Sequence, residues 1–463
     1  MSFTPADEHA QTPVSSQTPP GPKQFFKSTL AFQRMPLQFL ADLVRQYGDI
    51  SQFRLLTFPV VVINHPDYVQ HVLQKKNTNY DKDVFLFNTA RTFLGNGLVT
   101  AVGGESWRRQ RRLMQPAFHR QRIAQMATLM TEATLQLLKH WEQEVEEQRV
   151  LNVENEMTRL TLQIVGKALF TMDVSATSDA FGQAYAEVNA ALTNYLRFPL
   201  IPLTWPTPRG RRYKQAIRTM DEIAYAIIRQ RQQSKEERSD LLSLLVQARD
   251  EESGEGMSDR QLRDEVMTLL FAGHETSAKA LTWTWYLLSQ HPDVEQQLHR
   301  ELDTVLGGRV PTMEDLSALS YTRMVLEESM RLYPPSWQVM RQAIEDDTIG
   351  GYHIPAHTII FWSQYVVHRH PAFWHHPEQF DPLRFSPEEV KKRHPYAYIP
   401  FSNGPRVCIG NSFALAEMQL VLATIAQRYR LVMDPDARPV EPVALITLHP
   451  SHARMHVQPR EIG

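Results

Sequence analysis

The stretch from residue 258 to residue 290 constrains the fold of this chain more than any other. It contains no proline and a single glycine, Gly273, near its middle. Ser258 is followed three residues later by Gln261, a spacing typical of the capping box that begins a helix. The stretch therefore predicts one long helix. Because a glycine inside a helix lowers its stability by about 1 kcal/mol relative to alanine, Gly273 indicates a packing or functional requirement.

Helical periodicity dominates the rest of the chain. Between Ile123 and Trp141, apolar residues recur at spacings of three, four and seven, as on one face of a helix. A further helix is predicted from His291, with Pro292 in its first turn. Strand-like patterns occur mainly in four short segments: 50–56, 59–64, 350–362 and 441–448. We find no internal repeat or linker, so the sequence predicts a single, mainly helical domain with a small β part.

Composition and charge exclude several classes of protein. The net charge is −2 and the pI about 6.8, which gives no support to nucleic-acid binding. Residues 1–20 are polar and proline-bearing, without the apolar segment of a signal peptide or membrane anchor. We expect a flexible tail there and one domain over residues 21–463. The single cysteine cannot form an internal disulfide, which fits a reducing compartment. We therefore expect a cytoplasmic monomer without a membrane anchor.

That cysteine, Cys408, has four possible roles. A free cysteine is most often a small buried hydrophobe. It can also be a nucleophile paired with a histidine and a carboxylate elsewhere in the fold. A zinc-thiolate cluster needs several cysteines, so zinc is left with histidine-rich sites. The fourth role is the axial thiolate ligand of a heme iron.

The residues around Cys408 favour the last role. Gly404 permits a tight turn with positive φ before the ligand. Arg406 offers a guanidinium to a nearby carboxylate such as a heme propionate, and Phe401 offers an apolar wall. Gly410 lets the backbone pass close to a flat macrocycle. A continuous helical pattern follows directly, and its N-terminal N–H groups would stabilise a thiolate.

The spacing Phe401-x-x-Gly404-x-Arg406-x-Cys408-x-Gly410 resembles the heme-thiolate signature of the cytochrome P-450 superfamily.

Within the predicted long helix, AGHETS is similar to the oxygen-binding segment of the same family. The resemblance places small Ala272 and Gly273 against the heme. It also assigns Glu275 and Thr276 to proton delivery at the dioxygen site. We expect His274 to be packed or solvated and not to bind metal.

Three further motifs of the family occur in the family's order along the chain. Trp107 and Arg111, one helical turn apart, match a face that binds a heme propionate, and Arg341 is a plausible third propionate contact. The neighbouring basic residues Arg108, Arg109 and Arg112 could attract an acidic electron-transfer partner. Glu328 and Arg331 match the E-x-x-R helix, which Arg384 of Pro-Leu-Arg-Phe completes. The resemblance implies a structural role for these three residues and not a catalytic one.

The resemblance implies a cytochrome P-450 fold with heme b (iron protoporphyrin IX) between the long helix and the Cys408 loop. The implied enzyme is an oxidoreductase, a monooxygenase that inserts one atom of O2 into a lipophilic substrate, as in C–H hydroxylation. Electrons would come from a separate ferredoxin or flavodoxin with its reductase. Apolar segments assigned to the pocket favour a fatty acid first and a terpenoid or steroid-like molecule second.

Other functions remain open from the sequence. A peroxide-driven heme peroxygenase is the nearest, although such relatives often lack the acid and alcohol found at Glu275 and Thr276. A second alternative is a non-catalytic heme protein that acts as a binding protein or a sensor. A third alternative is a thiol hydrolase that uses Cys408 as its nucleophile. The apolar loop at 196–212 is expected to border the substrate entrance, with contact to a membrane surface as the alternative.

Overall fold

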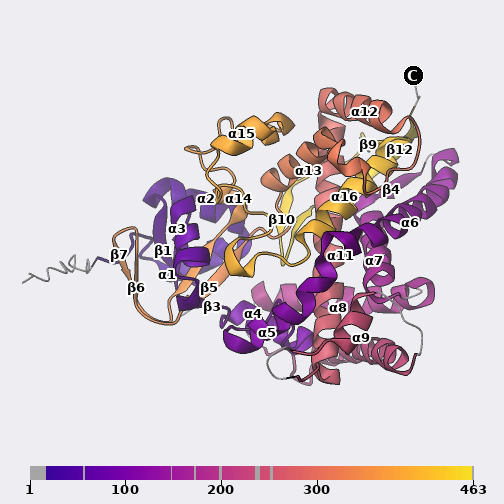
Figure 1. Ribbon diagram of the computed structural model, residues 1–463. Helices are drawn as coiled ribbons and strands as arrows, with labels where there is room; N and C mark the ends of the chain where they lie inside the picture. Colours follow the sequence, from indigo (N-terminus) through magenta and orange to yellow (C-terminus); the bar gives the residue numbers. More distant parts are fainter. Residues whose placement is uncertain are drawn as a thin grey trace, which may run out of the picture.

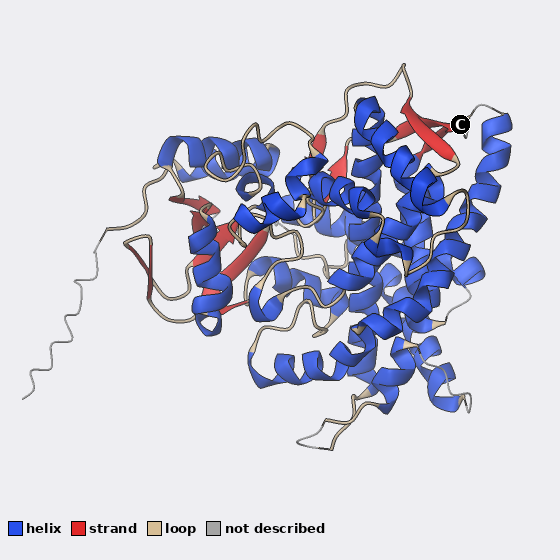
Figure 2. Cartoon of the chain, turned by 45° about the horizontal axis from the view of Figure 1, so that its top comes forward, coloured by secondary structure: helices blue, strands red, loops and turns tan. Residues whose placement is uncertain are grey.

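The computed structural model describes residues 17–55, 58–147, 149–171, 174–197, 201–234, 240–250 and 254–460. Most of the expected N-terminal tail and part of the loop at 196–212 lie outside these ranges. A strand-rich region and a larger helical region lie on opposite sides of the molecule (Figure 1). Figure 2 shows the predominance of helix, as the sequence predicted. Among the described residues, no helix is long and apolar enough to cross a bilayer.

The helices span most of the chain. Their bounds are α1 (Phe25–Arg34), α2 (Pro36–Tyr47), α3 (Pro66–Gln70), α4 (Phe85–Leu94), α5 (Gly104–Met114), α6 (Arg120–Glu146), α7 (Val153–Phe170), α8 (Val174–Arg197), α9 (Pro208–Gln233), α10 (Leu241–Gln247), α11 (Asp259–Gln290), α12 (Pro292–Leu306), α13 (Ser320–Leu332), α14 (Gln364–Val367), α15 (Pro387–Lys392) and α16 (Asn411–Ala426).

The strands form four small sheets. The largest has the order β1-β2-β8-β5-β3, and the others pair β4-β12-β9, β10-β11 and β6-β7. Their bounds are β1 (Ile50–Leu55), β2 (Phe58–Ile63), β3 (Tyr80–Asp81), β4 (Val150–Asn152), β5 (Val339–Ala343), β6 (Asp347–Ile349), β7 (Tyr352–Ile354), β8 (Ile359–Trp362), β9 (Tyr429–Met433), β10 (Pro442–Ala444), β11 (Leu448–Pro450) and β12 (Arg454–Pro459).

The long helix predicted from the sequence is α11, which runs through the middle of the helical region (Figure 1). The Ser258 hydroxyl accepts a hydrogen bond from the Gln261 N–H at 3.3 Å, which confirms the predicted N-cap. α11 packs against α7, α9, α13 and α16. A Cβ added to Gly273 would lie 3.0 Å from Cγ2 of Val165 on α7. Close packing of these two helices is therefore one reason for the glycine.

The five-stranded sheet explains the continuous apolar run in β2. Val61 and Ile63 belong to the core cluster on one face, while Val60 and Val62 belong to the cluster on the other. Because side chains alternate along a strand, a sheet buried on both faces needs apolar residues at every position. The sheet places β5, and with it Arg341, beside β8.

The sequence patterns located β1, β2, β7, β8 and β10 but missed β3, β4, β5, β6, β9 and β12. β5 follows a proline-rich turn, and its polar Arg341 and Gln342 disguise the strand pattern. The segment that follows the N-terminal tail folds as two helices, because Pro36 cannot continue α1 and begins α2 instead.

Candidate active site

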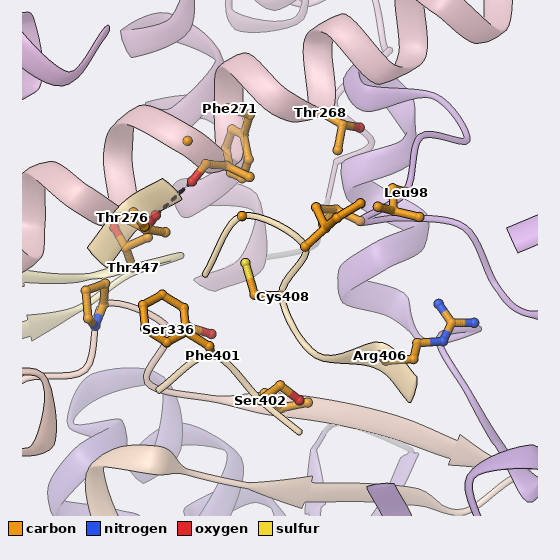
Figure 3. Close-up of a pocket in the computed structure, with 18 of the residues that line it drawn as sticks. Leu98, Thr268, Phe271, Thr276, Ser336, Phe401, Ser402, Arg406, Cys408 and Thr447 are labelled. Atoms are coloured by element: carbon orange, nitrogen blue, oxygen red, sulfur yellow. Dashed lines mark hydrogen bonds between the residues drawn. The ribbon is translucent and has the colours of Figure 1, made fainter. Parts of the chain in front are cut away.

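A mainly apolar cavity lies between the middle of α11 and the loop that precedes α16 (Figure 3). All the site residues predicted from the sequence line this cavity except Gly404 and Glu275. The predicted residues that line it are Thr276, Ala272, Gly273, Trp107, Arg111, Arg341, Phe401, Arg406, Cys408 and Gly410. Tertiary packing therefore brings these widely separated segments around one cavity. Figure 3 shows the sulfur of Cys408 pointing into it, toward the wall formed by α11.

The Cys408 loop is held in a turn by its own backbone. The N–H of Cys408 donates to the carbonyl of Phe401 at 2.9 Å, and the N–H of Val407 donates to Gly404 at 3.0 Å. Gly404 has φ +69°, and a Cβ there would collide with the carbonyl oxygen of Leu73. Gly404 thus lies behind the cavity and lets the loop approach the chain after α3.

The cavity surrounds the Cys408 thiol with apolar walls and cations. Burial raises the pKa of the thiol, while the N–H of Gly410 and the charges of Arg111 and Lys82 oppose this rise. A thiol in this environment holds its proton until a metal cation displaces it. Cys408 is therefore suited to bind an iron ion as a thiolate.

Four cations gather along one side of the cavity. Arg406 donates to the carbonyl of Ala101 at 3.0 Å. Arg111 donates to the carbonyl of Val407 at 2.6 Å. Arg341 on β5 and Lys82, directly after β3, complete the group, and both line the cavity. Among the described residues, no carboxylate forms an ion pair with any of these four side chains.

Burial and mutual repulsion lower the pKa values in this cluster, and the charge of Asp81 only partly opposes this effect at Arg341 and Arg406. Burial and the charge of Arg406 lower the pKa of Arg341 to about 9. Burial lowers the pKa of Arg406 to about 10, and burial with Arg341 and Arg406 lowers that of Lys82 well below its usual value. Buried cations without partners are unfavourable. The two propionates of heme would supply the missing negative charge, so the residues present fit this cofactor.

α11 forms the wall opposite Cys408. Thr276 lines the cavity, and its hydroxyl donates to the carbonyl of Ala272 at 2.7 Å, one turn earlier (Figure 3). Glu275 is buried but does not line the cavity. Its carboxylate accepts a hydrogen bond from Thr447 at 2.7 Å, on the segment between β10 and β11. The predicted acid and alcohol therefore lie next to each other in sequence but have different hydrogen-bond partners.

Several site residues were missed in the sequence. Lys82 lies in the charged run Asp81-Lys82-Asp83, which resembles an ordinary solvated segment. Thr447 and His449 lie near the C-terminus, in an apolar segment that the resemblance assigned to the pocket, but their contacts with Glu275 were not predicted. No local pattern marks these residues, because their importance depends on contacts with distant segments.

The residues assigned to a structural role form the expected network. Arg331 donates to the two oxygens of Glu328 at 2.6 and 2.8 Å, and Nε of Arg384 lies 3.5 Å from the same carboxylate. Glu328 and Arg331 are completely buried. His274 is packed against the ring of Tyr185, with centroids 4.7 Å apart. This histidine is therefore a packed residue, as predicted.

The basic face of α5 is less available to a partner than the sequence indicated. Arg108 lies 3.4 Å from Glu105, and Arg109 lies 3.8 Å from Asp250. Arg112 lies 3.2 Å from Glu105. Because these arginines have acidic partners within the chain, the positive charge of this face is partly neutralised.

The cavity does not fit a thiol hydrolase. Such an enzyme needs a base within hydrogen-bond reach of the nucleophile. Among the described residues that line the cavity, none is a histidine, an aspartate or a glutamate. Cys408 therefore has no histidine or carboxylate beside it in the described lining to accept its proton and orient it for nucleophilic attack.

Comparisons with known proteins agree with this geometry. A family model described as Cytochrome P-450 matches residues 18–457. Cyclooctat-9-en-7-ol 5-monooxygenase of Streptomyces melanosporofaciens is 38% identical over 92% of each chain. Pentalenene oxygenase of Streptomyces avermitilis is 33% identical over 96% of this chain and 98% of its own. The crystal structure of the cytochrome P-450DA heme domain matches with a TM-score of 0.87 and 30% identity, covering 96% of this chain and 98% of that domain.

Proposed function

Because the chain belongs to the cytochrome P-450 family, it is a heme-dependent monooxygenase, and we propose that its substrate is a terpenoid. The apolar cavity beside Cys408 supports a lipophilic substrate. The names of two similar enzymes refer to cyclooctat-9-en-7-ol and pentalenene, both terpenoids. These names favour a terpenoid over the fatty acid that we expected first from the sequence.

The residues around the cavity would divide the work of holding heme b. Cys408 would bind the iron as a thiolate, and Phe401 would shield the sulfur from water. Arg111, Arg341, Arg406 and Lys82 would bind the propionates, with Trp107 beside them. When bound, the heme activates O2 so that one oxygen atom enters a C–H bond and the other becomes water.

The chain itself would supply orientation, water exclusion and protons. The apolar wall of the cavity would hold the substrate against the heme and exclude bulk water. Thr276 would present its hydroxyl to the dioxygen site, and Glu275 would deliver protons through it. The presence of both residues supports an oxygen-dependent enzyme over a peroxygenase or a heme sensor.

The electrons would come from a separate ferredoxin or flavodoxin and its reductase. The sequence contains no glycine-rich nucleotide-binding fingerprint, which supports an external donor. The single cysteine and the absence of a spanning helix among the described residues support a cytoplasmic protein. Fast turnover of the purified chain with NADPH alone would contradict the separate donor.

The observation that carries the proposal is the placement of the Cys408 sulfur opposite Thr276, in an apolar cavity bordered by cations that form no ion pair with a carboxylate in the described part of the chain. The first test is the absorbance spectrum of the reduced, CO-bound protein, in which thiolate ligation shifts the Soret band strongly to the red. Substrate class is tested by the spin-state shift of the ferric protein with a panel of cyclic terpenoids and fatty acids. Binding of fatty acids alone would overturn the terpenoid assignment.

A further inference from the structure

The carboxylate of Glu275 is held from the side away from the cavity. Its Oε1 accepts a hydrogen bond from the Thr447 hydroxyl at 2.7 Å and lies 3.3 Å from Nε2 of His449. Its Oε2 is buried and has no hydrogen-bond partner among the described residues. The acid thus has one oxygen engaged by the C-terminal segment and one oxygen free for another partner.

His449 connects Glu275 to the edge of the protein. Its Nδ1 lies 2.7 Å from Oε1 of Glu154 at the beginning of α7, and Glu154 also pairs with Lys279 at 2.7 Å. The side chain of His449 is 15% exposed and that of Glu154 is 18% exposed, whereas Glu275 is 3% exposed. The imidazole therefore bridges a carboxylate that solvent reaches and one that it does not.

The surrounding charges favour the protonated form of this imidazole. The charged groups that face the ring are Glu154 from α7 and Glu275 and Lys279 from α11. Burial opposes the charge, but the hydrogen bonds to Glu154 and Glu275 outweigh it and raise the pKa of His449. His449 and Lys279 then balance Glu154 and Glu275, so the buried cluster is neutral as a whole.

The segment that carries His449 is firmly attached to the core. Trp283 on α11 donates to the carbonyl of Leu448 at 2.9 Å, and the N–H of Leu448 donates to Pro335 at 3.0 Å. Thr447 itself lines the cavity. The distance between His449 and Glu275 is therefore set by packing and not by a loose chain end.

We propose that His449 is a positioning residue that supplies protons to Glu275 and keeps its carboxylate turned away from the cavity until the proton arrives. This inference rests on the proposed function, in which Glu275 delivers protons to Thr276. It assigns a role to the C-terminal segment beyond shaping the cavity. It also makes the neutral cluster of Glu154, Lys279, His449 and Glu275 a proton path from the protein edge.

The step is a proton transfer without any other bond change. Nε2 of His449 lies 2.9 Å from the Thr447 hydroxyl, which in turn donates to Glu275, so the proton passes through this hydroxyl. The Nε2–H bond of the imidazolium breaks, Thr447 receives that proton as it gives its own to Glu275, and an O–H bond forms on the acid. This leaves a neutral imidazole, an unchanged Thr447 hydroxyl and a neutral acid. Since the charge attraction between them is then lost, the acid is released to turn toward Thr276. Water at the exposed edge of the ring returns a proton to His449.

The main test compares His449→Gln with His452→Gln, a matched change on a partly exposed histidine whose Nε2 lies 2.7 Å from the carbonyl oxygen of Arg438. Oxygen-driven turnover uses a surrogate ferredoxin and reductase, and peroxide-driven turnover uses hydrogen peroxide, which brings its own protons. We expect His449→Gln to lose at least about tenfold in product per NADPH consumed, with an increased solvent isotope effect, while peroxide-driven turnover is retained. His452→Gln should match the parent protein. Equal coupling in His449→Gln and the parent would overturn the inference.

A second variant keeps the inference testable if His449→Gln does not fold. Glu154→Gln removes one anion beside the ring and so lowers the pKa of His449. Because the protonated ring is the donor, turnover should fall as pH rises through this pKa, and the variant should show that fall at lower pH. Histidine 15N NMR of the reduced, CO-bound holoenzyme reports the ring directly, and a pKa of His449 at or below that of an ordinary imidazole would contradict the proposal.

These outcomes separate the inference from the proposed function. If the parent protein lacks the red-shifted CO band and turns over with neither oxidant, the monooxygenase assignment itself fails. If the parent is active and the His449 variants behave like it in coupling and pH profile, only the role of His449 is wrong.

Discussion

The guanidinium of Arg406 lies over the indole ring of Trp107, with its central carbon 4.2 Å from the ring centroid. The contact joins the Cys408 loop to α5, and both side chains line the cavity. A cation over an aromatic face is stabilised by about 0.5–2 kcal/mol, more when it is shielded from water. The ring therefore keeps Arg406 in place for a propionate.

This contact predicts different effects of two substitutions at Trp107. Trp107→Phe keeps an aromatic face under Arg406, whereas Trp107→Ala removes it. We expect heme to leave the alanine variant roughly tenfold faster and the phenylalanine variant only a few-fold faster, since about 1.4 kcal/mol corresponds to a factor of ten. The measurement is the rate of heme transfer to an excess of apomyoglobin. Equal rates for the two variants would show that the ring face is unimportant.

A second prediction concerns the hydroxyl of Thr276. Thr276→Ala removes the hydroxyl at the cavity, while Thr282→Ala removes a similar hydroxyl that bonds its own preceding turn at 2.7 Å outside the cavity. We expect the first variant to retain heme but to lose about tenfold or more in product per NADPH, with hydrogen peroxide released instead. The second should stay coupled. Product and peroxide are measured in the same reaction, and uncoupling in both variants would argue for a general helix effect.

A third prediction separates backbone strain from collision at Gly404. Gly404 and Gly307 both have positive φ, but only Gly404 would bring a Cβ into the backbone of Leu73. Gly307→Ala should lower the free energy of unfolding by about 1–2 kcal/mol, the usual preference of an L-residue against left-handed backbone. Gly404→Ala should lower it by more than about 3 kcal/mol and reduce heme content. Unfolding in urea, followed by the Soret band, measures both, and equal losses would contradict the collision.

A fourth prediction concerns acid stability. Burial, with the charges of Arg331 and Arg369, lowers the pKa of His368 to about 3, and its Nε2 accepts the N–H of Ile399 at 2.9 Å. The unfolded chain binds this proton near pH 6.5 and the folded protein does not, so stability falls as pH drops below about 6.5.

The expected contribution of His368 is about 1.4 kcal/mol for each pH unit between 6 and 4. His368→Gln retains a hydrogen-bond acceptor without the titration, so its stability should vary less with pH. The exposed His375 provides the control, as His375→Gln should follow the parent protein. Urea midpoints at pH 6.5 and 5 measure the difference. Parallel curves for parent and His368→Gln would show that this ring does not set the acid sensitivity.

Much of the site could be predicted because its key segments are local in the sequence. The turn around Cys408 depends on Gly404 and on bonds between residues a few positions apart, so spacing alone reveals it. The long helix and its N-cap at Ser258 likewise follow from preferences within a few turns. The E-x-x-R pair of Glu328 and Arg331 lies within one turn and forms as expected.

The sequence by itself thus determined the ligand loop, the long helix and the family to which both belong. Only the tertiary structure decided which cations surround the cavity and which groups contact Glu275. Lys82 and Arg341 meet through the pairing of β3 with β5, and His449 meets Glu154 across 295 residues of sequence. The physical reason is that backbone preferences act over a few neighbouring residues. The charge and proton state of a buried side chain depend instead on whatever distant groups the packing brings beside it.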